Sequence, residues 1–173
     1  MKLIIKTNRL YLRELTIDDA IHFFEMNNDE AVIKYTGDTS FDSLDAAKDF
    51  LKAYQSNYTN YKMGRWAVCL NDTNEMIGWC GLKYHPEEKL VDVGYRFYQK
   101  YWNKGYATEA TKASLDYGFN FLKLDKIVAH VHKDNIGSHK VALKTGLHFV
   151  KDFIYDDKPA KFYEITKNTN QVT

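Results

Sequence analysis

The sequence has few cysteines, and the two present, Cys69 and Cys80, cannot supply the disulfide framework of a small secreted domain. Each lies among apolar residues with strand character, so we interpret both as buried, unreactive thiols in a reducing compartment. A chain of 173 residues buries about two thirds of its unfolded surface and needs neither disulfide nor metal to fold. We therefore expect one domain over residues 1–173 and no metal site.

The chain also has no excess of charge of one sign and no long hydrophobic run. Its 24 Lys and Arg residues oppose 23 Asp and Glu residues, for a net charge of +1. This balance supplies no broad positive field for nucleic acid or an anionic membrane, so a bound anion must be held locally. The apolar patch at residues 3–5 is followed by Lys6, Asn8 and Arg9, and is too short for a signal peptide or a membrane span. We predict a cytoplasmic protein with no nucleic-acid or membrane partner.

Hydrophobic periodicity predicts a mixture of helices and strands. Helices are expected over residues 16–27 (capped by Thr16), 43–54, 105–122 and 135–144, the last closed by Gly146. Strands are expected over residues 9–15, 66–70, 76–84, 90–98, 126–131, 148–155 and 161–166, with residues 167–173 as a frayed tail. The middle strands form an antiparallel meander, and helix 105–122 joins two parallel neighbours by a right-handed crossover. The polar segment 35–42 is either a substrate-binding loop or a plain linker.

Residues 91–110, VDVGYRFYQKYWNKGYATEA, combine a strand, a basic turn with a glycine, and the start of a helix rich in small residues. The first amides of a helix have no intrahelical partner, and the helix dipole adds partial positive charge, so such a start can hold a phosphate. Gly105 lets an oxygen approach the main chain, and Lys104 adds a full charge. Taken alone, this short motif is more often an ordinary strand-to-helix connection, so the rest of the sequence has to support a phosphate site.

Three features in this order, VDVGYRF with WNKGYATEA, a following strand, and NIGSHKVALKTG, resemble the GNAT superfamily of acyl-CoA N-acyltransferases. Within it the chain is most similar to the branch of ribosomal-protein N-terminal acetyltransferases, which shares the RLxLR start and the stretch at residues 77–82. The resemblance spans most of the chain and is strongest over residues 90–149. It implies an α+β (mixed α/β) fold: a single GNAT-like domain with a central, twisted, mostly antiparallel sheet, flanked by helices and splayed between the fourth and fifth predicted strands.

The same resemblance implies acetyl-CoA as co-substrate. Its pantetheine arm would insert at the splay and pair with the backbone of Tyr95, Arg96 and Phe97, because separating strands leave amides and carbonyls unpaired. Asn135 would bind the arm near the thioester, with a plain helix cap as the other interpretation. Trp102 stands where the family usually has Gln or Arg, so one polar contact is in doubt. The diphosphate would rest on a phosphate cradle made of Asn103, Lys104, Gly105, Tyr106, Ala107 and Thr108.

Acetyl transfer to an amine requires a base for the amine proton and a donor for the departing thiolate. Many relatives carry a tyrosine donor seven positions after the asparagine, where this chain has Ala142, so Ser138 becomes the predicted donor, as in the ribosomal-protein branch. A thiol titrates at about 8.5, so an imperfect donor suffices. His130 stands where some relatives have an acid and is the predicted base. Three nearby residues compete with it for this role: His85, Asp92 and His132.

The resemblance predicts an acetyl-CoA-dependent N-acetyltransferase that acts on the primary amine of a protein N-terminus or of a small molecule. The alternative is an acyl-CoA-binding regulatory domain with little or no catalysis, which the absent tyrosine would permit. A polycationic acceptor would need carboxylates in a deep pocket. Four acids are candidates for that pocket, or else ordinary solvated charges: Asp29, Glu30, Asp38 and Asp42. Such folds also allow a homodimer.

Overall fold

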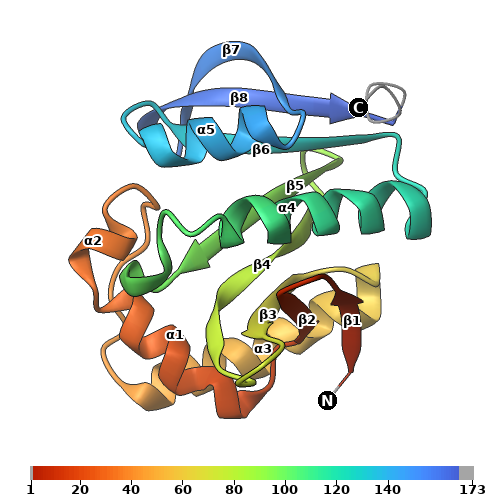
Figure 1. Ribbon diagram of the computed structural model, residues 1–173. Helices are drawn as coiled ribbons and strands as arrows, with labels where there is room; N and C mark the ends of the chain where they lie inside the picture. Colours follow the sequence, from red (N-terminus) through yellow and green to blue (C-terminus); the bar gives the residue numbers. More distant parts are fainter. Residues whose placement is uncertain (1, 168–173) are drawn as a thin grey trace.

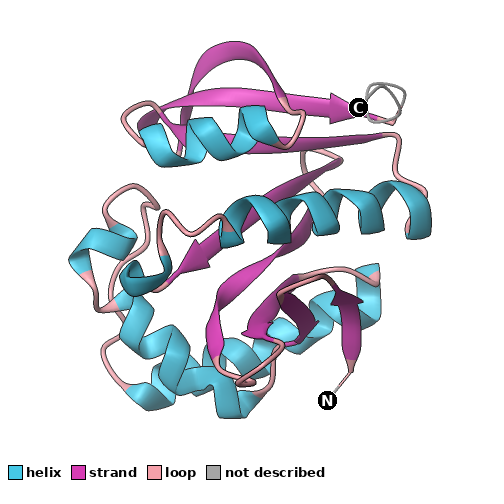
Figure 2. Cartoon of the chain, in the orientation of Figure 1, coloured by secondary structure: helices cyan, strands magenta, loops and turns pink. Residues whose placement is uncertain are grey.

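The computed structural model describes residues 2–167. They form one eight-stranded sheet with the strand order β1-β2-β3-β4-β5-β6-β8-β7, flanked by helices (Figures 1 and 2). All neighbouring pairs are antiparallel except β5 with β6. The predicted mixed fold with a mostly antiparallel sheet is therefore confirmed.

Most predicted elements are present with shifts of a few residues at their ends, except that α3 extends seven residues beyond its predicted end. The strands are β1 (Leu3–Lys6), β2 (Leu10–Glu14), β3 (Arg65–Leu70), β4 (Met76–His85), β5 (Leu90–Phe97), β6 (Lys126–His132), β7 (His148–Tyr155) and β8 (Lys158–Thr166). The helices are α1 (Ala20–Asn27), α2 (Glu30–Ile33), α3 (Leu44–Tyr61), α4 (Tyr106–Asp116) and α5 (Ile136–Lys144), with 3₁₀ turns at Ile17–Asp19 and Gln99–Tyr101 and a π-helical turn at Tyr117–Phe121. Two elements escaped the sequence prediction, β1 and α2, because four residues are too few to display a period.

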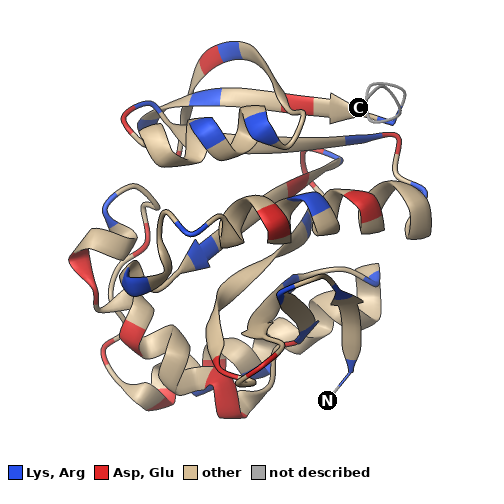
Figure 3. Ribbon diagram, viewed as in Figure 1, with Lys and Arg blue, Asp and Glu red and all other residues tan. Residues whose placement is uncertain are grey.

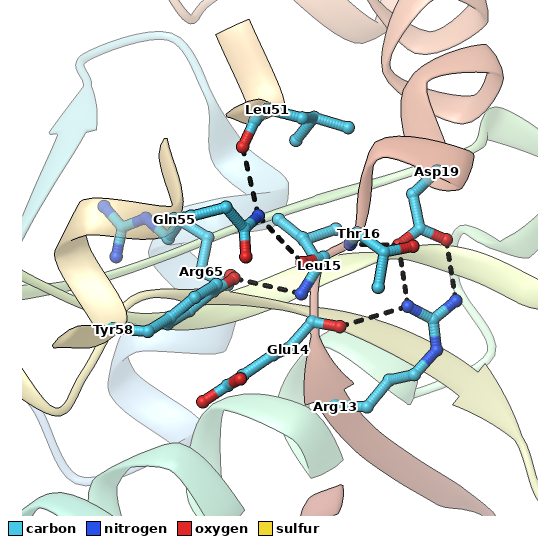
Figure 4. Close-up of polar contacts among 9 residues, drawn as sticks. All are labelled: Arg13, Glu14, Leu15, Thr16, Asp19, Leu51, Gln55, Tyr58 and Arg65. Carbon is cyan, nitrogen blue, oxygen red and sulfur yellow. Dashed lines mark hydrogen bonds and ion pairs between the residues drawn. The ribbon is translucent and has the colours of Figure 1, made fainter. Parts of the chain in front are cut away.

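Side-chain hydrogen bonds fix the first helices to the end of β2 (Figure 4). Arg13 pairs with both carboxylate oxygens of Asp19, each at 2.7 Å. That carboxylate also accepts the amide of Thr16 at 2.8 Å, which fixes the turn that leads into α1. Tyr58 of α3 accepts the amide of Leu15 at 3.1 Å. Helix α3 and the turn that leads into α1 are thus tied to the end of β2 by a largely buried network of hydrogen bonds.

Small residues bring α4 close to the sheet, as predicted. Ala110 and Ser114 are fully buried. A Cβ on Gly118, in the turn that follows α4, would lie 2.6 Å from Ile127 Cδ1 and 2.9 Å from Leu82 Cδ1, so any larger residue there would have to displace these side chains. The regular helix ends earlier than predicted, because the chain widens into the π-helical turn after Asp116. Helix α4 forms the crossover between β5 and β6 (Figure 1).

The remaining local predictions concern caps, thiols and the tail. Gly146 has a φ of 90°, the left-handed conformation expected after α5. Cys69 and Cys80 are both fully buried, and burial raises the pKa of each thiol. Of the predicted tail, Lys167 is described and donates its amide to the carbonyl of Asp125 at 3.0 Å. The rest of that tail lies outside the described residues.

Candidate active site

The parallel strands β5 and β6 separate soon after they meet, as the predicted splay requires. They pair at a single position, Asp92 with Val128. The backbone of Tyr98 faces β4, because its amide donates to the carbonyl of Ile77. Successive residues of an antiparallel strand direct their backbone groups to alternate sides, so residues an odd number of positions from Tyr98 face away from β4. The backbone groups of Tyr95 therefore point away from β4 and into the gap. Such groups can pair with an extended, amide-containing ligand.

Trp102 has a role in this region that the sequence did not predict. Its indole nitrogen donates to the carbonyl of Phe97 at 2.9 Å. This hydrogen bond occupies one of the backbone groups that was expected to bind the pantetheine arm. Trp102 therefore anchors the phosphate cradle to the end of β5, although it lacks the polar side chain usual at this position.

The phosphate cradle has the geometry of an anion site at the start of α4. Asn103 and Gly105 both have left-handed backbone conformations, with φ of 60° and 80°. The amides of Gly105, Tyr106, Ala107 and Thr108 donate to no group among residues 2–167. Four unpaired amides at one helix start, together with the helix dipole, favour an anion there.

Arg9, which lies just before β2, holds the cradle from the side. Its guanidinium donates to Glu109 of α4 at 2.6 Å and to the carbonyl of Lys104 at 3.0 Å. It also lies over the ring of Tyr106, 4.6 Å from the centroid. Arg9 therefore fixes the turn at Lys104 to the first turn of α4. This contact was not predicted, because the partners are about a hundred residues apart in the sequence.

A cavity of about 170 Å³ occupies the gap between β5 and β6. Tyr95, Asn135 and Ser138 line it together with Ala142 on α5. Paired residues of neighbouring strands point to the same face, so Asp92, Val128 and His130 share one face of the sheet. Tyr95 therefore points to the opposite face, toward α4 and α5. The cavity reaches both faces, with the predicted donor on one side and the predicted base on the other.

Two of the predicted site residues make contacts on the α5 side of the cavity. Asn135 caps α5 by accepting the amide of Ser138 at 3.1 Å, which confirms the helix-cap interpretation. The Ser138 hydroxyl accepts a hydrogen bond from the hydroxyl of Tyr95 at 2.9 Å. Burial raises the pKa of Tyr95 to about 12, although the bond to Ser138 works in the opposite direction. Tyr95 is therefore a neutral hydrogen-bond donor at ordinary pH.

On the other face, His130 lies in an aromatic setting and has no polar partner. Both of its ring nitrogens are buried and form no hydrogen bond within residues 2–167. Its neighbours are aromatic, with the ring centroid of Tyr155 at 4.4 Å and that of Phe162 at 5.4 Å. Burial holds the pKa of His130 below its usual range, so the ring is neutral near pH 7. His130 also lines the cavity, and a neutral imidazole whose nitrogens have no hydrogen-bond partner within residues 2–167 is suited to accept a proton.

Among the competing bases, Asp92 is less suitable than His130. Asp92 pairs with Arg65 through two hydrogen bonds of 2.9 and 2.7 Å and contacts His85 at 3.1 Å. Burial alone would raise the pKa of Asp92, but the charge of Arg65 and the His85 hydrogen bond lower it to about 2. So stable a carboxylate is a poor proton acceptor. His132 lines the cavity, and its Nδ1 accepts the amide of Asp134 at 3.2 Å.

The side chain of Arg96 takes no part in the predicted cofactor site. It projects to the face opposite Tyr95 and contacts Asn27 and Asp38. Its backbone faces β4 by the same alternation that directs the Tyr95 backbone into the gap, so the prediction that the Arg96 backbone binds the arm is not supported. Asp38 is thus paired, and Asp29 caps α2 by accepting the amides of Ala31 and Val32. The acidic pocket considered for residues 29–42 is absent, since none of its four acids lines the cavity. Segment 35–42 does contribute to the cavity through residues 35–37.

No cluster of three or more His, Cys, Asp or Glu side chains within residues 2–167 is arranged to hold a metal ion. No helix in the same range is both long and apolar enough to cross a membrane.

Comparison with known proteins identifies the fold and the family. The acetyltransferase (GNAT) domain family matches residues 9–148. The uncharacterized N-acetyltransferase p20 of Bacillus licheniformis is 32% identical over 152 residues, 87% of this chain and 84% of that protein. A GNAT-family acetyltransferase structure from Bacillus anthracis superposes with a TM-score of 0.82 at 28% identity, covering 95% of this chain and 98% of the other.

The same fold occurs in a more distant protein, a spermidine N-acetyltransferase from Vibrio cholerae in complex with CoA and spermine. Its TM-score is 0.80 at 19% identity, with 95% of this chain and 99% of that chain covered. Fold, family match and relatives agree. The chain belongs to the GNAT family of acetyltransferases and is an acyltransferase.

Proposed function

We propose that this protein transfers the acetyl group of acetyl-CoA to a primary amine at the gap between β5 and β6. One observation carries the proposal: a single cavity is lined by Ser138 on one face of the sheet and, on the other, by His130, whose buried ring nitrogens have no hydrogen-bond partner within residues 2–167. A reaction that needs a donor at sulfur and a base at nitrogen fits this arrangement. GNAT acetyltransferases use acetyl-CoA, and bound acetyl-CoA supplies an activated thioester.

The residues present suit that co-substrate. Four unpaired amides and a left-handed Gly105 favour a diphosphate at the phosphate cradle. Lys104 adds a charge, and Arg9 holds the turn in shape. The backbone of Tyr95 offers an amide and a carbonyl to an extended arm in the gap. We assign the cradle to the diphosphate and Tyr95 to the arm.

On the acceptor side, His130 takes the proton from the attacking amine. Its neutral form is present near pH 7 because burial holds its pKa low. Ser138, on the opposite side of the cavity, stabilises the sulfur as the C–S bond breaks.

We propose an acceptor with a single primary amine, on a protein N-terminus or a small molecule. The only carboxylate among the described residues lining the cavity is Asp156, and Lys158 lies beside it. A polyamine with several charges would lack partners there. A peptide N-terminus is the acceptor of the ribosomal-protein branch that the sequence resembles, so we rank it first.

Thiol release from acetyl-CoA tests this function. The wild-type protein is mixed with three acceptor sets: short peptides with free N-termini, small monoamines, and spermidine. We expect release with at least one of the first two sets and little with spermidine. CoA binding without release for any acceptor would instead support the acyl-CoA-binding regulatory domain and overturn catalysis.

A further inference from the structure

The hydroxyl of Tyr95 reaches the predicted donor from a different element of the fold. Tyr95 lies on β5 and Ser138 on α5, and the hydroxyl of Tyr95 donates to Ser138 Oγ at 2.9 Å. Both side chains line the cavity in the gap. Because Ser138 accepts this bond, its own hydrogen is free to turn toward a ligand in the cavity.

The neighbouring residue on α5 leaves room for this arrangement. Ala142 lies four residues after Ser138, so the two share one face of the helix, and both line the cavity. Ala142 is buried and carries no polar group. The family's usual tyrosine is therefore missing from α5, but a tyrosine hydroxyl reaches the same helix face from β5.

We propose that Tyr95 is a positioning residue that orients the Ser138 hydroxyl toward the sulfur of the leaving thiol. This inference rests on the proposed function. It assigns the Tyr95 side chain a role distinct from that of its backbone. Tyr95 donates to Ser138, Ser138 donates to sulfur, and the two aligned hydroxyls act as one polarised donor.

The pair works by hydrogen bonding and not by proton transfer. When the C–S bond breaks, its electron pair stays on sulfur, while the new C–N bond forms and His130 accepts the amine proton. A thiol titrates at about 8.5, whereas the pKa of Tyr95 is about 12. Transfer of a proton from Tyr95 to the thiolate would thus be uphill, so the thiolate leaves stabilised by Ser138 and takes its proton from water.

The test compares wild type, Tyr95→Phe, Ser138→Ala and the double variant. We expect each single variant to lower kcat about 10- to 100-fold, with little change in the affinity for coenzyme A. The double variant should lose little more, since both hydroxyls serve one interaction. A second readout is the pKa of the coenzyme A thiol in the complex, followed by thiolate absorbance against desulfo-coenzyme A. The pKa of the bound thiol should be higher by about one or more in Tyr95→Phe than in wild type.

Tyr163→Phe is the matched control. The Tyr163 hydroxyl also bonds to α5, at His139 Nδ1 and 2.9 Å, but not to Ser138. We expect this variant to keep the kcat and bound-thiol pKa of wild type. Equal kcat and equal thiol pKa in Tyr95→Phe and wild type would overturn the inference, as would equal losses in both tyrosine variants. Absence of coenzyme A binding by wild type would contradict the proposed function itself.

Discussion

At the scale of single residues, the state of His130 decides the acceptor half of the proposed reaction. The imidazole has no polar partner within residues 2–167, and burial keeps its pKa below the usual range. We expect His130→Gln to lower kcat/KM about 100-fold near pH 7, most strongly below the pKa of the amine. In wild type, protonation of the amine lowers kcat/KM at all pH values below the amine's pKa, and protonation of His130 should add a further, steeper decline below about pH 6.5. The measurement is kcat/KM as a function of pH.

His132→Gln is the control for this prediction. His132 lies two residues further along β6 and lines the same cavity. The His132→Gln variant should show the same decline of kcat/KM at low pH as wild type. If the two variants share one pH profile with wild type, His130 is not the base.

The sequence indicated some of these residues and not others. Asn135, Ser138 and His130 were predicted from their positions in the resemblance to the GNAT superfamily, and strand alternation added that His132 shares the face of His130. The hydroxyl of Tyr95 reaches Ser138 across 43 residues, and that contact depends on how α5 lies across the gap. No local pattern contains such information.

At the scale of elements, the start of α4 depends on a residue from another part of the chain. Arg9 bridges Lys104 and Glu109, both near that helix start. We expect Arg9→Ala to weaken coenzyme A binding about 10-fold while the fold is kept, because a charge-assisted brace is lost. Calorimetric titration with coenzyme A measures the change.

Lys48→Ala removes an exposed ion pair with Asp45 on α3 and should leave the affinity unchanged. Equal affinities for Arg9→Ala and wild type would show that the cradle keeps its shape without the brace.

Close packing of α4 on the sheet gives a second prediction. The Cβ of Gly118→Ala would meet Ile127 and Leu82 at 2.6 and 2.9 Å, whereas that of Gly137→Ala would meet only Asn135 Oδ1, at 3.7 Å. We expect Gly118→Ala to lower the free energy of unfolding by about 1–3 kcal/mol. Gly137→Ala, within α5, should raise it by about 0.5–1 kcal/mol. Urea denaturation measures the free energy of unfolding of each variant. Equal changes in Gly118→Ala and Gly137→Ala would contradict this packing.

Element prediction worked where a pattern was long enough. Strands β3, β4 and β5 were bounded by clear turns, and the small residues of α4 indicated its close packing. The end of α4 was wrong because the widening after Asp116 depends on packing against the sheet. The extension of α3 to Tyr61 was missed as well, since its last turns have few apolar residues.

At the scale of the whole molecule, both signs of charge are interspersed, as along α4 in Figure 3. Within this mixture, the ion pair of Asp92 and Arg65 is buried, and it therefore affects stability. The folded-state pKa of Asp92 is about 2, below the unfolded value of 3.8. Its contribution, about 2 kcal/mol, is therefore complete above about pH 4 and is lost as pH falls toward 2. Unfolding free energies measured across this range should show the decline.

Arg65→Met should remove this contribution and leave a buried carboxylate unpaired, with a loss of about 3–5 kcal/mol at pH 7. An unchanged stability would contradict the structural role of the pair.

We also propose that residues 1–173 form one domain, so fluorescence and circular dichroism should report a single unfolding transition.

The central claim is that coenzyme A binds across the gap between β5 and β6, with its diphosphate on the first amides of α4. A crystal structure of the complex with coenzyme A is its most direct test. We expect the pantetheine arm to pair with the backbone of Tyr95, the diphosphate to lie on Gly105 to Thr108, and the sulfur to face Ser138. Coenzyme A bound elsewhere, or a gap closed by pairing of the two strands, would contradict the account.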